Sequence, residues 1–191
     1  MEKRKAWSLQ EVVLLAFIAF IFGAVFMGGG YLYAPLEATL SIYGYAPFAN
    51  QILFGIWTIA APVAAMIVRR PGTAILGELL AALAEMLYGS YFGAGVLISG
   101  LIQGAGSELG FTLTKYKRYD SLPLWYGAVG TTVLSFIYEY FKYGYMEFSP
   151  MMIIGLLVVR FISVAFFNVF LVQAIMKIYQ EIESSIGAHN G

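Results

Sequence analysis

The 191-residue sequence contains no cysteine and a single histidine, His189, close to its C-terminal end. A chain without cysteine has no disulfide, no thiolate nucleophile and no cysteine-ligated metal. Because its only histidine lies outside the apolar segments, it also has no Ser–His pair within them and no clustered histidines for zinc. The phosphate-binding pattern G-x-x-x-x-G-K-[ST] is absent as well, so we expect no ATP hydrolysis by that route. These absences argue against an enzyme, and we expect no cofactor and no metal site.

Charge is scarce too. Charged residues make up 12% of the chain, whereas soluble domains carry about 25%. Hydrophobic residues make up 60%, and the mean hydropathy is +0.77. We therefore predict an integral membrane protein with a single membrane domain over residues 1–191. The start, MEKRKAW, is basic, but the apolar run after it is long and lacks an A-x-A cleavage signal, which indicates a first membrane helix and not a removed signal peptide.

Six apolar runs approach the roughly 20 residues that a helix needs to cross a bilayer. We predict an all-α bundle of six membrane helices, followed by a polar tail over 181–191. Pro62 should kink the second helix by removing a backbone donor. The segment 31–47, rich in tyrosine and broken by proline, should form a long first outer loop that acts as a lid, with a short helix at 36–42. The predicted spans cover 9–29, 48–68, 72–88, 92–113, 122–141 and 151–177.

The basic residues segregate along this arrangement, and lysine and arginine are concentrated in the cytoplasmic loops of membrane proteins. With the N-terminus inside, only Lys142 falls on the outer side of the membrane and only Arg160 falls within a span. We therefore predict a multi-pass plasma-membrane protein with both termini in the cytoplasm. The basic residues placed inside are Lys3, Arg4, Lys5, Arg69, Arg70, Lys115, Lys117, Arg118 and Lys177.

Several acids lie within the predicted spans, where an ionised carboxylate is costly and usually faces a cavity or a partner. Arg160 should pair with Glu78 or Glu108 and fix helix packing, and we favour Glu78. Glu85 and Glu139 lie about 5 Å from the outer ends of their helices at 1.5 Å per residue. If these two acids are ionised, the outer region suits a cationic ligand.

Aromatic and small residues allow two interpretations each. Trp57, Tyr88 and Tyr138 lie toward the outer side, where an interfacial aromatic belt accounts for half or more of such residues. A few of them are expected to stack on a flat ring or hold a cation. Small residues on the first helix either serve packing within the chain or form a docking face for another membrane protein. These residues are Ala16, Ala19 and Gly23.

The six runs, the long first outer loop, the small residues and the aromatic, acidic outer region together resemble the substrate-binding S-components of energy-coupling-factor (ECF) vitamin transporters. The chain is most similar to the YkoE type, associated with thiamine or its hydroxymethylpyrimidine precursor. The AxxxA docking motif of that family is matched loosely by Ala19 with Gly23, and Ala16 precedes them by three residues. The resemblance implies a transmembrane T-component and two ATP-binding-cassette ATPases as partners, and a subunit that topples in the membrane to release its vitamin.

The favoured hypothesis is a membrane-embedded subunit that binds a thiamine-like cation and catalyses nothing. The acids would supply charge, and the amides would bond the pyrimidine. The alternatives are a small membrane enzyme, a self-sufficient carrier, a scaffold protein, or an S-component for another vitamin. Carriers often contain inverted repeats, and the sequence has no clear repeat. No nucleic-acid partner is expected. The predicted ligand-binding residues are Glu85, Glu139, Gln103, Asn50, Trp57, Tyr88 and Tyr138.

Overall fold

The computed structural model describes residues 6–189, with side chains described as far as residue 185. This part of the chain is helical and contains no β-strand, in agreement with the predicted all-α class. Lys3, Arg4 and Lys5, which support the predicted orientation, lie outside the described residues, as do the last two residues of the predicted polar tail. The helices are α1 (Leu9–Ser41), α2 (Pro47–Leu53), α3 (Ala60–Val68), α4 (Thr73–Tyr88), α5 (Val96–Leu113), α6 (Ser121–Lys142), α7 (Pro150–Ala165) and α8 (Val172–His189).

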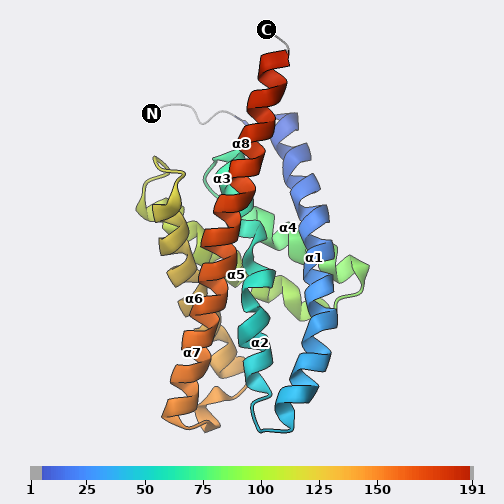
Figure 1. Ribbon diagram of the computed structural model, residues 1–191, viewed down its shortest axis with the longest axis vertical. Coiled ribbons are helices and arrows are strands. Elements are labelled where there is room, and N and C mark those ends of the chain that lie inside the picture. The colour runs from blue at the N-terminus through green and yellow to red at the C-terminus, as the bar shows by residue number, and fades with distance from the viewer. Residues whose placement is uncertain (1–5, 190–191) are drawn as a thin grey trace.

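These helices form six rods, because two pairs are continuous (Figure 1). A 3-10 helix, Phe54–Thr58, joins α2 to α3, and a π-helix, Phe166–Leu171, joins α7 to α8. By length and composition, four helical segments of the described chain are able to cross a membrane: Leu9–Ser41, Pro47–Val68, Gly93–Leu113 and Pro150–Ser185. Helix α4 has 16 residues and α6 is less apolar, so the six predicted crossings remain a prediction.

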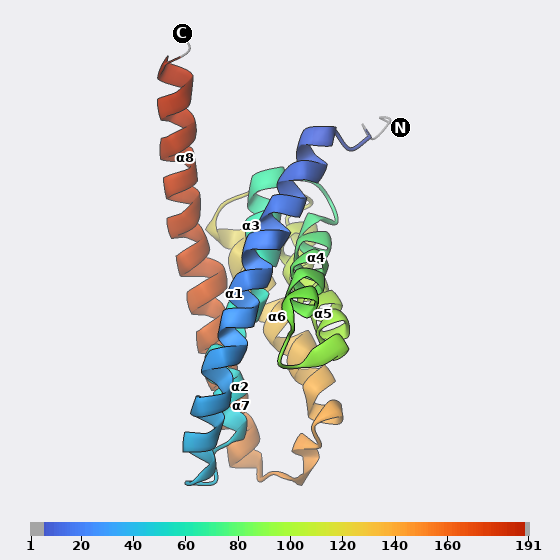
Figure 2. The ribbon, with the colours of Figure 1, turned by 90° about the vertical axis from the view of Figure 1, so that its right-hand side faces the viewer.

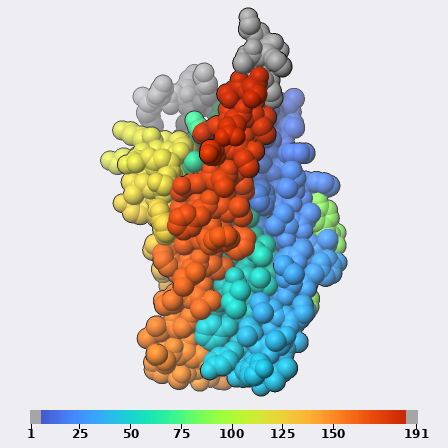
Figure 3. Space-filling model, in the orientation of Figure 1, coloured from blue at the N-terminus to red at the C-terminus, as the bar shows by residue number. Residues whose placement is uncertain are grey.

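The two ends of the molecule differ. Both described termini lie at one end, together with the α3–α4 turn and the loop 114–120 (Figures 1 and 2). The links 42–46 and 143–149 lie at the other end. The basic residues at 69–70 and 115–118, which are predicted to be cytoplasmic, therefore share one end, as the prediction requires. The α4–α5 turn reaches only about midway along the long axis. On the face drawn in Figure 3, α2 lies between α1 and α7, and α8 continues α7 toward the end with the termini.

The predicted long outer loop is wrong, because α1 continues without interruption to Ser41. Gly29 and Gly30 do not end the helix. Their lack of a side chain instead allows other residues to pack closely on α1, since a Cβ built at Gly29 would lie 3.1 Å from the Trp57 ring. Beyond Pro35, local hydrogen bonds support the helix. The Tyr33 hydroxyl donates to Glu37 Oε1 at 2.8 Å, one turn later. Only residues 42–46 link α1 to α2, so no lid-like loop lies there.

The second rod is broken, but at a different place and for a different reason than predicted. Pro62 is the third residue of α3, where the missing N–H is one that lacks a helical partner anyway. The break is the 3-10 helix Phe54–Thr58, whose freed backbone groups are bonded by side chains of other helices. Gly55 N donates to Ser163 Oγ at 3.0 Å, and Ala61 N donates to Glu78 Oε2 at 2.7 Å. A membrane tolerates non-helical backbone only when it is satisfied in this way.

The small residues of α1 serve packing against α4. A Cβ built at Gly23 would lie 2.5 Å from Ala84 Cβ and 2.9 Å from Glu85 N. Ala19 is buried as well, whereas Ala16 is exposed. The predicted docking face of Ala16, Ala19 and Gly23 is therefore corrected: its two buried members pack inside the chain and are not available to a partner. The close approach also fixes the backbone around Glu85.

We expect Gly23→Ala to destabilise the detergent-solubilised protein by about 1–3 kcal/mol, because the added methyl group overpacks the α1–α4 contact. The measurement is the midpoint of thermal unfolding. Gly28→Ala is the matched control on the same helix, because no atom lies within 4 Å of its Cβ position. Alanine favours a helix over glycine, so the control should hold or raise the midpoint. Equal midpoints for the two variants would contradict the packing role of Gly23.

Candidate functional site

An inner cavity lies between α1, α2, α4, α5 and α6, with about 470 Å³ of empty space including its mouth. Small-molecule sites are typically apolar with a few placed polar groups. Its walls combine aromatic rings with acids and amides from separate helices. The lining residues are Phe26, Asn50, Phe54, Trp57, Glu85, Phe92, Gly95, Val96, Ser99, Gln103, Glu139, Lys142 and Tyr143.

Glu85 is the acid of this cavity with the fewest partners. It lies on the last turn of α4 and is 2% exposed. Ser90, in the α4–α5 turn, donates to its Oε1 at 2.8 Å. Among the described residues, nothing bonds its second oxygen, and no cation pairs with it. A buried carboxylate with one neutral donor retains most of its capacity to accept hydrogen bonds or to face a cation.

The two predicted amides also reach the cavity. Gln103 on α5 is buried, and its side-chain amide has no hydrogen-bond partner in the described part of the chain. Asn50 on α2 donates from Nδ2 to Glu139 Oε2 at 2.8 Å. The structure therefore places Gln103 ready for a ligand, whereas Asn50 is already engaged in orienting Glu139.

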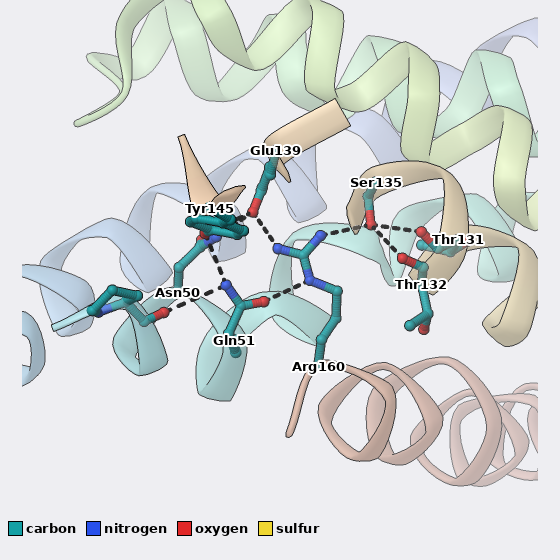
Figure 4. Close-up of polar contacts among 9 residues, drawn as sticks. Asn50, Gln51, Thr131, Thr132, Ser135, Glu139, Tyr145 and Arg160 are labelled. Carbon is teal, nitrogen blue, oxygen red and sulfur yellow. Dashed lines mark hydrogen bonds and ion pairs between the residues drawn. The ribbon is translucent and has the colours of Figure 1, made fainter. Parts of the chain in front are cut away.

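Glu139 belongs to a buried network centred on Arg160, which is 0% exposed (Figure 4). Arg160 Nη2 forms an ion pair with Glu139 Oε2. Its Nε donates to Gln51 Oε1 at 2.6 Å, and its Nη1 donates to Ser135 Oγ at 3.0 Å. The guanidinium carbon lies 3.9 Å from the centre of the Phe54 ring. The charge of Glu139 is thus balanced inside the protein.

The predicted ion pair between Arg160 and Glu78 is wrong, and so is the alternative with Glu108. Arg160 lies on α7 beside α2 and α6, and its donors are taken up there. Glu78 instead accepts from the backbone at the break before α3, as described above. Glu108 caps the start of α4, because it accepts from Gly72 N at 2.6 Å and from Ala74 N at 2.9 Å. Both acids satisfy backbone donors, which sequence spacing alone does not reveal.

Of the three aromatic residues predicted to stack on a ligand, only Trp57 lines the cavity. Its Nε1 donates to the Phe26 carbonyl at 2.9 Å, which fixes the indole. Tyr88 lies outside the lining, with its hydroxyl donating to the Phe20 carbonyl at 3.2 Å. Tyr138 is also outside, with the Lys142 Nζ 5.1 Å from its ring centre. Tyr138 directly precedes Glu139 and therefore points about 100° away around α6. Tyr88 lies three residues after Glu85, on a neighbouring position of the same face, and its bond to the Phe20 carbonyl turns it toward α1.

The structure adds residues that sequence reasoning did not select. Phe92 lies in the α4–α5 turn, and its ring centre is 5.3 Å from that of Trp57. Lys142 and Tyr143 reach the cavity from the end of α6, and Ser90 holds Glu85. The aromatic turn at 88–92 was a visible signal for Phe92. Tyr143 belongs to the tyrosine-rich segment that begins at Tyr138, whereas no sequence pattern points to Ser90 or Lys142.

Comparisons with known proteins agree with this architecture. The family described as "ABC-type cobalt transport system, permease component" matches residues 10–134. The chain is 35% identical to the putative HMP/thiamine permease protein YkoE of Bacillus subtilis (strain 168), over 159 residues that are 83% of this chain and 77% of the relative. A crystal structure of an S-component of an ECF transporter superposes with a TM-score of 0.83 and 30% identity, covering 97% of this chain and 98% of that one.

These relatives are transporter components, so the chain is not an enzyme, and it is a multi-pass protein of the plasma membrane. The fold, the apolar helices and the sequence relatives point the same way. The chain belongs to the permease-component family of ABC-type cobalt transport systems, and within it to the YkoE-type S-components of ECF transporters.

Proposed function

We propose that this chain is the substrate-binding subunit of an ECF-type importer and that its inner cavity binds thiamine or its hydroxymethylpyrimidine precursor. The observation that carries the proposal is Glu85, a buried carboxylate that faces a cavity walled by aromatic rings. Among the described residues, Ser90 alone donates a hydrogen bond to it. A carboxylate in such a place is costly for folding alone. An amino group or a cation on a flat heterocycle offsets that cost.

The roles of the other lining residues follow from their contacts. Gln103 has a free amide, which offers both a donor and an acceptor to a pyrimidine ring. Trp57 and Phe92 supply ring faces and edges, which pack well on a flat ligand. Glu139 lines the site but does not supply the charge that meets the ligand, because Arg160 already neutralises it. We therefore place the positive group of the ligand near Glu85.

Energy for uptake must come from other subunits, since this chain contains no phosphate-binding loop of the P-loop type. We propose a transmembrane T-component and two ATP-binding-cassette ATPases as partners. The Ala19–Gly23 groove is not their docking surface, because it is filled by α4. The outward face of α1 is apolar and exposed, with Phe17 at 61% and Phe20 at 64%. Lipid or the T-component covers this face.

Glu85→Gln should weaken binding of thiamine by roughly tenfold to a hundredfold, or about 1.4–2.8 kcal/mol, because the charge that faces the ligand is removed while the size is kept. The measurement is titration of the purified protein with thiamine by isothermal calorimetry. The thermal midpoint of this variant should stay close to that of the parent. Unchanged affinity would show that Glu85 is not the ligand's partner.

Glu139→Gln is the informative contrast. It leaves the fully buried Arg160 without a counter-ion, and removing one partner of a buried pair costs about 3–5 kcal/mol. Its main effect should therefore be a large drop in the thermal midpoint, whereas Glu85→Gln mainly affects binding. If the two variants behaved alike in both measurements, the division between a structural acid and a binding acid would be wrong.

The orientation proposed from the basic residues places the α1–α2 link outside the cell. Because the chain has no cysteine, single cysteines can be introduced without background labelling. We expect Tyr43→Cys, at a site that is 72% exposed, to react with an impermeant thiol reagent in intact cells. Lys117→Cys, in the loop at the opposite end, should react only after the cells are permeabilised. The reverse pattern would invert the proposed topology.

A further inference from the structure

A second and larger hollow adjoins the inner cavity, with about 830 Å³ of empty space including its open side. It lies between the ends of α1 and α2, the α4–α5 turn and the segment that follows α6. In Figure 2 the α4–α5 turn stops about midway along the molecule, above that segment. Asn50, Phe92 and Tyr143 line both hollows. We call the larger hollow the vestibule.

The vestibule has a distinct chemistry. Glu37 is the one charged residue among those that line it, and it is half-buried. Its Oε1 accepts from the Tyr33 hydroxyl at 2.8 Å, and no cation pairs with it among the described residues. The rest of the wall is dominated by rings. The aromatic residues are Tyr33, Tyr91, Phe92, Tyr143, Tyr145 and Phe148.

Aromatic faces beside one carboxylate attract cations, because the ring quadrupole and the negative charge act in the same direction. We propose that the vestibule is a separate, weaker binding site for heteroaromatic cations, which holds the ligand before it passes Phe92 into the inner cavity. The proposal rests on the function proposed above and extends it: thiamine, with its permanent positive charge, uses this site, and uncharged hydroxymethylpyrimidine does not.

The local structure supports a capture role rather than a tight site. The helical extension of α1 puts Tyr33 and Glu37 one turn apart on the same face, so both point into the hollow. Tyr91 is 58% exposed and Tyr143 is 48% exposed, so water reaches the rings and weakens each contact. Charges that line such a mouth act chiefly on the rate of association. Release from the inner cavity is governed by other residues.

The test is stopped-flow tryptophan fluorescence on the purified full chain, with thiamine and with hydroxymethylpyrimidine at mildly alkaline pH. Glu37→Gln should lower the association rate constant of thiamine by about three- to tenfold, and its dependence on salt should weaken. The dissociation rate constant and both constants for hydroxymethylpyrimidine should stay the same. Glu147→Gln is the matched control, since Glu147 is an exposed acid on the same outer side that does not line the vestibule.

A second variant guards against a merely structural effect. Tyr91→Leu removes one exposed ring, and it should also slow association of thiamine alone without a change in the thermal midpoint. Unchanged association of thiamine in Glu37→Gln would overturn the proposal, and so would equal slowing of both ligands. If the parent protein bound neither ligand, the proposed function itself would fail, which is a different result from any of these.

Discussion

A fully buried guanidinium, that of Arg160, holds together the half of this bundle that contains the inner cavity. In a membrane-embedded core, every charge and every free backbone group must find its partner inside the protein, because no water is present to replace it. Arg160 meets this demand by donating to Gln51 on α2 and to Ser135 on α6, while pairing with Glu139. Three rods are thereby fixed at the depth of the inner cavity. Burying the Arg160 charge without a counter-ion would be costly. Glu139 is therefore held in this ion pair and is unsuited to binding the charge of a ligand.

The same constraint explains the broken second rod. The 3-10 helix Phe54–Thr58 frees backbone groups, and Ser163 and Glu78 bond them from α7 and α4. The break has a consequence for the site, because Phe54 and Trp57 lie in it and both line the inner cavity. Glu108 likewise accepts hydrogen bonds from free backbone N–H groups at the start of α4, the helix that carries Glu85. Among the buried acids of the described chain, Glu78 and Glu108 accept from backbone donors and Glu139 pairs with Arg160. Glu85 is thereby left to meet a ligand in the inner cavity.

How far the sequence predicts this structure depends on the range of the interaction. Apolar run length, a property of neighbouring residues, correctly predicted six helical rods and the membrane class. Contacts between rods were harder to predict from the sequence. Arg160 pairs with Glu139 and not with Glu78, because the rotation of each helix about its axis decides which side chains meet. The first span was predicted to end at residue 29, yet Gly29 serves close packing on Trp57 within α1. Tyr88 and Tyr138 lie near Glu85 and Glu139 in the sequence, yet neither lines the cavity, because Tyr88 bonds the Phe20 carbonyl on α1 and Tyr138 lies beside Lys142.

The continuation of α1 changes the physical picture of the outer side. A flexible loop over residues 31–47 would contribute a lid that orders only on binding. A helix instead fixes Tyr33, whose ring centre lies 5.1 Å from that of Phe92, which in turn lies 5.3 Å from that of Trp57. These rings form a continuous aromatic path from the vestibule to the inner cavity. One acid stands near each end, Glu37 in the vestibule and Glu85 in the cavity. A flat cation moving along this path exchanges water for ring faces gradually and meets a full desolvation cost only where Glu85 offsets it.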